Sequence, residues 1–241
     1  DYENALLNFQ AIPFNYDSIS QNAYYLTGNI YLKAGKKAEA MNAFMLANNN
    51  FDQEIQEDAL FKYGQLAYEL QYTPYNEPIN AFQKYIEYFP NSPRIDEVNQ
   101  YLAELFQTTK NYKLALESIE KIKTRNYKLN LAYQRIAYHR GIEFFNNSEY
   151  EDAILLFNKS LENQLSKPYT AQSLFWKAES QYRLKQYDKA IETYYLFTTQ
   201  AGAFDLPYYR DAHYNIGYSF FHIKRYGDAN TAFLKYIASR G

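Results

Sequence analysis

The chain has 241 residues, and its 25 Lys and Arg against 27 Asp and Glu give a formal net charge of −2. A chain so close to neutral has no general attraction for nucleic acid or for anionic lipid. It has no cysteine and no apolar run of about 18 residues, so we expect no disulfide, thiol nucleophile, cysteine-based zinc site or membrane span. Tyr, Phe and Trp make up 19% of the residues and, with Leu, Ile and Ala, supply ample material for a core.

The first predicted element is a helix over residues 2–12, in the segment DYENALLNFQAI. It carries Tyr2, Ala5 and Phe9 at a spacing that returns throughout the chain. The sequence starts at Asp1, without the basic and then apolar layout of a signal peptide. We therefore expect residues 1–20 to form half of a repeated unit, and the chain to be a piece of a longer protein.

A phrase of Tyr, Ala and a large apolar residue then returns every 35 to 39 positions, as in EYEDAILLF (149–157), QYDKAIETY (186–194) and RYGDANTAF (225–233). Its small-residue slot is filled in turn by Ala5, Ala40, Pro78, Ala115, Ala153, Ala190 and Ala229. Twelve positions earlier stands a second small residue, namely Gly28, Ala103, Gly141, Ala178 and Gly217, and also Gly64 once two extra residues in QYTPYNEP are allowed for. Such a period predicts a stack of similar units.

Each copy is predicted to be a hairpin of two helices. In AYYLTGNIYL and AHYNIGYSFF, apolar residues recur at steps of three and four, as one face of a helix requires. The small residues of the two helices let the backbones approach closely, and the large apolar residue four positions after the Ala fills the layer beneath. We expect thirteen helices, one leading helix and six hairpins, and no sheet.

This pattern resembles the tetratricopeptide repeat, a family of 34-residue helix–turn–helix units. With units that start near residues 21, 57, 96, 134, 171 and 210, the last unit matches best, through Ile216, Gly217, Phe220, Tyr226, Ala229 and Phe233. No unit has the usual Trp at its fourth position, and Lys177 and Arg140 stand where Leu is expected. The resemblance implies an all-α fold and a single domain over 1–241, in which antiparallel hairpins form a right-handed superhelix with a concave groove.

In this family the first helix of each hairpin lines the groove with positions 2, 5, 9, 12 and 13, and the groove usually binds peptides or proteins. The resemblance implies a groove lined by Tyr25, Asn29, Phe61, Tyr68, Tyr138, Phe145, Phe175, Glu179, Tyr182, Tyr214, Tyr218 and Phe221. The third unit is polar at these positions, so the aromatic part is expected in units four to six. Two interpretations stay open for each ring, packing against the next hairpin or recognition of a partner, and both can hold.

Other functions find no support in the sequence. The clamp with which some family members hold chaperone carboxylates needs Lys at position 5, where this chain has Tyr25. His139, His213 and His222 stand in different helices or slots, and there is no HExxH motif or phosphate loop. Scattered Lys residues leave no basic stripe for RNA. We therefore expect no enzyme activity, cofactor, metal or nucleic acid partner.

The expected function is a scaffold that binds a partner protein or peptide. The stretch YFPNSPRIDEVNQYL (88–102) resembles hairpin junctions of bacterial envelope proteins of this family, including barrel-assembly lipoproteins and cell-division coordinators. This favours a periplasmic or cell-envelope location and a role in envelope assembly, with the cytoplasm as the alternative.

Two other functions stay open. Starch-utilisation lipoproteins of this family build sugar sites on their helices, so a glycan-binding module of an outer-membrane uptake system is the main alternative. Those proteins carry long insertions between hairpins, whereas the longest connections here, such as TTQAGAFDLPYYRDA, have only about a dozen residues, which makes this alternative less favoured. The chain could also be an accessory module beside an enzyme domain.

The two ends of the chain lack neighbours of their own kind. The helix at 2–12 has no hairpin partner, and Phe233, Leu234, Tyr236 and Ile237 of the last helix are too many to face the preceding helix together. We expect further repeats of a longer chain, or self-association, at these ends.

Overall fold

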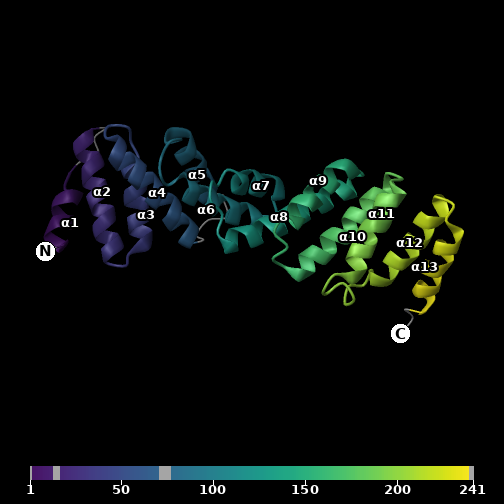
Figure 1. Ribbon diagram of the computed structural model, residues 1–241. Coiled ribbons are helices and arrows are strands. Elements are labelled where there is room, and N and C mark those ends of the chain that lie inside the picture. The colour runs from purple at the N-terminus through teal and green to yellow at the C-terminus, as the bar shows by residue number, and fades with distance from the viewer. Residues whose placement is uncertain (1, 13–16, 71–76, 239–241) are drawn as a thin grey trace. The chain divides into compact units, whose positions relative to one another are not determined.

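The computed structural model describes residues 2–12, 17–70 and 77–238, and over these residues it contains thirteen α-helices and no β-strand (Figure 1). The predicted all-helical fold and the predicted number of helices are therefore confirmed. The helices fall into two compact units. Unit 1 consists of residues 1–105 with 121–123, and unit 2 of residues 106–120 with 124–241. The division falls within α6 (Ile95–Thr108).

Unit 1 begins with α1 and continues with two hairpins, in which each helix packs against the next. Its helices are α1 (Tyr2–Gln10), the pair α2 (Ser18–Lys33) and α3 (Lys37–Ala47), the pair α4 (Gln53–Leu70) and α5 (Glu77–Tyr88), and most of α6. Asp17 begins α2, because its Oδ1 accepts a hydrogen bond from the Ser20 amide at 2.7 Å and so satisfies one of the free N–H groups of the first turn.

Unit 2 contains one further helix and three hairpins, again packed in chain order. Its helices are α7 (Tyr112–Glu120), the pair α8 (Tyr127–Asn146) and α9 (Tyr150–Leu161), the pair α10 (Lys167–Arg183) and α11 (Tyr187–Thr199), and the pair α12 (Tyr209–His222) and α13 (Tyr226–Ala238). On α13, Leu234 and Ile237 are each 56% exposed, whereas Phe233 is partly buried against Gly217. The expectation that not all the apolar side chains of α13 face α12 is therefore confirmed.

In four hairpins a glycine of the first helix lies under a phenylalanine ring of the second, where the sequence predicted a close approach of the two backbones with the large residue in the layer beneath. A Cβ atom added to the glycine would lie within 3 Å of the ring in all four pairs, which are Gly28 with Phe44, Gly64 with Phe82, Gly141 with Phe157 and Gly217 with Phe233. The alanines of the repeated phrase at positions 40, 115, 153 and 190 have no exposed surface. The small residues therefore set how closely the helices approach.

Replacing Gly141 by alanine should destabilise unit 2 by about 1–3 kcal/mol, as overpacking of a close contact does. The added Cβ would lie 2.7 Å from Cε1 of Phe157, a ring with no exposed surface, so the ring or the helix would have to shift. Gly227→Ala is the matched control, because no atom lies within 4 Å of its added Cβ. Urea unfolding followed by circular dichroism checks both variants, and equal midpoints for the two would contradict the role of the glycine.

A second contact, which the sequence reasoning missed, involves the first residue of the repeated unit. Gln21 is fully buried; its Nε2 donates to the carbonyls of Asn49 at 2.6 Å and Asp52 at 3.1 Å, and its Oε1 accepts from the Asp52 amide at 2.8 Å. Gln134 stands at the same position of the fourth repeat. It accepts a hydrogen bond from the Ser166 amide at 2.8 Å and donates one to Thr170 Oγ1 at 3.0 Å. Each glutamine thus joins its helix to the loop that leads into the next hairpin.

The part of the chain that the structure describes contains neither a membrane-spanning helix nor a cluster of metal ligands. No helix there is both long and apolar enough to span a bilayer. The same residues contain no group of three or more His, Cys, Asp or Glu side chains arranged to hold a metal ion.

Candidate functional site

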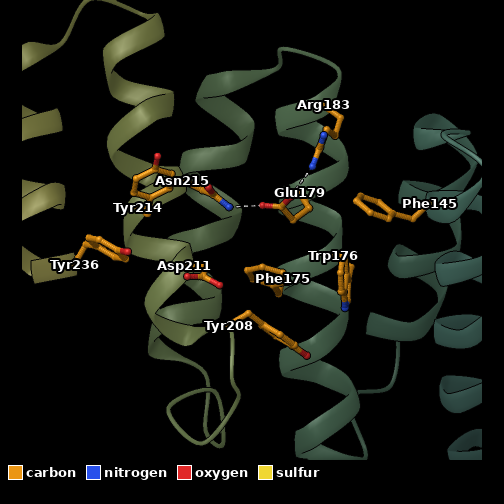
Figure 2. Close-up of a pocket in the computed structure, with 10 residues that line it drawn as sticks. All are labelled: Phe145, Phe175, Trp176, Glu179, Arg183, Tyr208, Asp211, Tyr214, Asn215 and Tyr236. Atoms are coloured by element: carbon orange, nitrogen blue, oxygen red, sulfur yellow. Dashed lines mark hydrogen bonds and ion pairs between the residues drawn. The ribbon is translucent and has the colours of Figure 1, made fainter. Parts of the chain in front are cut away.

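A pocket of about 670 Å³ opens in unit 2 on the first helices of the hairpins (Figure 2). It is lined by residues of α8, α10, α12 and α13 and by the loop before α12. Six of its ten lining residues are aromatic, namely Phe145, Phe175, Trp176, Tyr208, Tyr214 and Tyr236. The other four are polar or charged, namely Glu179, Arg183, Asp211 and Asn215. A largely aromatic pocket with a few converging polar groups has the composition of a ligand site.

The aromatic walls of the pocket are held in place by one another. The rings of Phe175 and Tyr208 stack with their centroids 4.2 Å apart, and Trp176 meets Phe145 edge to face at 4.9 Å. Only 4% of Phe175 is exposed, and burial raises the pKa of the Tyr208 hydroxyl to about 12. Rings fixed in this way present a preformed surface, so a ligand would lose little free energy in ordering them.

The charged centre of the pocket is Glu179, which is buried on α10. Its Oε1 accepts short hydrogen bonds from the Tyr194 hydroxyl and from Asn215 Nδ2, as Figure 2 shows for Asn215. Its Oε2 lies 4.0 Å from Nη2 of Arg183, too far for a hydrogen bond. Burial raises the pKa of the Glu179 carboxyl, and the bond from Tyr194, the charge of Arg183 and the bond from Asn215 offset this only in part.

The structure brings together four of the eight site residues predicted in this unit. Phe145, Phe175, Glu179 and Tyr214 line the pocket, whereas Tyr138, Tyr182, Tyr218 and Phe221 do not. Tyr138 is buried, with its ring 6.2 Å from that of Phe157 and 5.3 Å from that of Tyr169. Tyr182 is partly buried and meets Tyr187 edge to face. Tyr218 and Phe221 are exposed on α12 and extend the aromatic surface from Tyr214.

The four site residues predicted in unit 1 make contacts between successive repeats. Tyr25 donates its hydroxyl to Asp58 at 2.7 Å, and Tyr68 donates to Glu104 at 2.7 Å. Asn29 Oδ1 accepts from Lys62 at 2.8 Å. Phe61 is buried, with the guanidinium of Arg94 4.8 Å from its ring centroid. Each of these four side chains therefore has a packing or hydrogen-bonding role inside the protein, and their role in partner binding stays a prediction.

Asp58 is the centre of this network in unit 1. Besides Tyr25, it pairs with Lys62 at 2.7 Å and with Arg94 at 2.8 Å. Burial acts to raise the pKa of Asp58, but hydrogen bonds from Lys62, Tyr25 and Arg94 outweigh it, so the pKa lies below its usual value. The chain thus supplies the cations that this carboxylate needs.

Six other residues line the pocket. Arg183 and Asp211 stand at groove positions 13 and 2, and the sequence reasoning missed the remaining four. Trp176 and Asn215 each stand at position 6 of their unit, next to the groove positions that the resemblance implies. Tyr208 precedes α12, and Tyr236 belongs to a second helix, so neither lies on the first-helix face that was considered. Aromatic residues at position 6 were the signal that could have found part of this wall.

Comparison with known proteins agrees with the repeated architecture. The family model of the tetratricopeptide repeat matches residues 138–205, and a second model of the same family matches residues 58–92. No curated protein gives a significant match.

Several solved structures are similar in fold. A tetratricopeptide repeat protein from Parabacteroides merdae is 16% identical, with a TM-score of 0.45 over 100% of this chain and 86% of the other. The C-terminal part of such a protein from Cytophaga hutchinsonii is 18% identical, with a TM-score of 0.41 over 99% and 90%. The TPR2AB domain of yeast Sti1, solved as a complex with pHSP90, is 16% identical, with a TM-score of 0.36 over 88% of both chains.

The assignment rests on the sequence matches and on the repeated hairpins rather than on these distant structures. One family model matches a segment of unit 1 and the other a segment of unit 2. Hairpins in which glycine and phenylalanine meet at the same positions occur in both units. Residues 58–92 and 138–205 match the tetratricopeptide repeat family, and the chain is a tetratricopeptide repeat protein.

Proposed function

We propose that this protein is a non-enzymatic scaffold that binds a peptide segment of a partner protein at the aromatic pocket of unit 2. The observation that carries the proposal is the preformed pocket itself, in which rings from four helices surround a few polar groups. Tyr and Trp are enriched where proteins bind one another, because a large rigid ring gives much contact area at little cost in entropy.

The surface beside the pocket supports an extended ligand. Tyr214, Tyr218 and Phe221 lie along α12 and are 40%, 37% and 52% exposed. The rings of Tyr214 and Tyr218 are 4.6 Å apart, so they form one continuous apolar strip that leads away from the pocket. A peptide in extended or helical form could place one side chain in the pocket and others along this strip.

Tyr214→Ala should weaken the binding of a partner peptide about 30-fold, the loss that corresponds to roughly 2 kcal/mol for an aromatic anchor. Ligands are obtained by selecting a displayed peptide library on the purified chain. Binding is then measured by the fluorescence of Trp176, the one tryptophan of the sequence and a wall of the pocket. Phe204→Ala, at an exposed ring outside the pocket, is the control and should bind normally. A library that yields no ligand, or ligands that ignore Tyr214→Ala, would refute the proposal.

Glycan binding is the competing function, because flat rings beside carboxylate and amide groups also suit a sugar ring. The same Trp176 fluorescence, measured with a panel of soluble oligosaccharides, separates the two. A response to oligosaccharides without any peptide ligand would replace the scaffold proposal by glycan capture.

We also propose that the protein works in the bacterial cell envelope. The resemblance of residues 88–102 to junctions of envelope proteins supports this location, and the absence of cysteine fits an oxidising compartment. Fractionation of the native host with an antibody against the chain tests it, and recovery in the cytoplasm alone would contradict it.

A further inference from the structure

The contact between Glu179 and Asn215 in unit 2 has a counterpart in unit 1, formed by the same positions of the repeat. Position 9 is Asn29 in the first repeat, which lies in unit 1, and Glu179 in the fifth repeat, which lies in unit 2. Position 6 of the repeat that follows is Lys62 in unit 1 and Asn215 in unit 2. The two pairs make corresponding contacts. Lys62 Nζ donates to Asn29 Oδ1 at 2.8 Å, and Asn215 Nδ2 donates to Glu179 Oε1. The same site is therefore built twice, from different side chains.

In unit 1 this site encloses a cation that the chain itself provides. The ammonium of Lys62 pairs with Asp58 at 2.7 Å and lies 5.1 Å from the ring centroid of Tyr25 and 5.2 Å from that of Phe44. A carboxylate and two rings at such distances stabilise an ammonium group. The equivalent positions of unit 2 also hold a carboxylate and two rings, namely Asp211, Phe175 and Tyr194.

In unit 2 the position that corresponds to Lys62 holds no cation, and the position that corresponds to Asn29 holds a carboxylate. Asn215 replaces the lysine and Glu179 replaces the asparagine, so the neutral set of unit 1 corresponds to a set with two negative charges. Arg183, with 55% of its side chain exposed, approaches Glu179 only to 4.0 Å. Asp211 makes no hydrogen bond or ion pair with the described residues. A carboxylate buried with so little compensation favours the arrival of a cation.

We infer that the pocket of unit 2 receives a basic side chain, lysine or arginine, of the bound peptide. The charged head takes the place that Lys62 has in unit 1, between Glu179 Oε2 and Asp211. The aliphatic stem lies on the rings of Phe175, Trp176 and Tyr208, as the stems of long basic side chains do on apolar surface. This inference rests on the proposed function and specifies which side chain the peptide must offer.

The geometry also makes binding depend on pH in one direction. The groups that face Glu179 are Arg183 and Tyr182 on α10, Tyr194 on α11, and Asp211 and Asn215 on α12. Burial raises the pKa of Glu179, and a cation binds its ionised form. The affinity of the pocket for a basic side chain should therefore reach its full value at pH values above the raised pKa of Glu179. It should fall as the pH decreases through that pKa, because Glu179 then becomes protonated.

The first experiment uses blocked peptides of sequence Gly-Gly-Lys-Gly-Gly and Gly-Gly-Arg-Gly-Gly, with norleucine in place of lysine as the uncharged comparison. Binding is followed through Trp176 fluorescence. The basic peptides should bind at least tenfold more tightly than the norleucine peptide, which is the ratio that about 1.4 kcal/mol gives. Glu179→Gln, which keeps an acceptor for Tyr194 and Asn215, should abolish the ratio. Glu192→Gln, at an exposed position of α11, should leave it unchanged.

The second experiment changes the protein instead of the peptide. Asn215→Lys restores the lysine of unit 1, and it should lower the pKa of Glu179, measured by carboxyl carbon NMR, and remove the binding of both basic peptides. An unchanged Glu179 pKa with normal binding of the lysine peptide would show that the two sites are not equivalent, and would overturn the inference.

The outcomes separate this inference from the proposed function. If library peptides bind, but exchanging lysine for norleucine changes their affinity at no position, the proposed scaffold function stands and the inference of a basic side chain is wrong. If neither the library nor the basic peptides bind, both are wrong.

Discussion

Replacing Phe157 by alanine is expected to lower the free energy of unfolding of unit 2 by about 4 kcal/mol, within the range for a buried ring in a core. Phe157 has no exposed surface, lies directly over Gly141 and belongs to the cluster around Tyr138 and Ala153. Because the ring fills the gap that the glycine leaves between α8 and α9, its removal opens a cavity that backbone atoms line on one side. Close packing of the two helices then loses its main contact.

The effect can be measured locally, because Trp176 packs against the same cluster. Its fluorescence during urea unfolding reports the transition of unit 2. Phe204→Ala provides a truncation of equal size at a ring that is 78% exposed, and it should cost less than 1 kcal/mol. Similar losses for the two variants would mean that the pairing of glycine and phenylalanine does not hold the hairpin together.

Gln134→Leu should have the second largest effect, a loss of about 3 kcal/mol. The change nearly conserves volume but removes the acceptor of the Ser166 amide and the donor to Thr170. Each buried polar group left without its partner costs about 1–3 kcal/mol, so the loss of both exceeds the cost of a single surface hydrogen bond. The damage is expected at the connection between α9 and α10 rather than within either helix.

Hydrogen exchange measured by mass spectrometry locates this damage, since faster exchange should appear first in peptides that cover residues 162–170. Gln83→Leu makes the same change at an exposed position of α5 and should leave stability within about 0.5 kcal/mol. A Gln134→Leu protein as stable as this control would exclude a structural role for the buried amide.

The helices were predictable from the sequence because their contacts are local and repeated. A glycine that faces a phenylalanine requires both residue types at a fixed separation, so Gly28 and Phe44 leave the same trace as Gly217 and Phe233. The buried glutamines left no such trace. Position 1 is glutamine in the first and fourth repeats but glutamate at 57. Gln21 binds backbone groups of its loop, and Gln134 accepts from a backbone amide, and such groups carry no sequence signal.

The site was only half predictable, because exposure depends on neighbours that a periodic pattern does not reveal. Tyr138 and Tyr214 occupy the same position of their units, yet the first is buried beside Phe157 and Tyr169 and the second is 40% exposed. The position rule also omitted the loop residue Tyr208, which closes the wall by stacking on Phe175. Family positions thus indicated the helix face on which the pocket opens, while the pocket itself also depends on irregular parts of the chain.

The side chains at position 1 bear on how far the repeats can be exchanged for one another. Gln21 fits the carbonyls of its own loop, whereas Glu57 accepts from Ser92 and Tyr85. A shuffled chain in which the repeat at 57 was followed by the loop that follows Gln21's hairpin would place the Glu57 carboxylate opposite carbonyl oxygens. Each of these repeats therefore matches the loop that follows it. A hairpin transplanted to another position must carry that loop with it to keep the hydrogen bonds of its position-1 side chain.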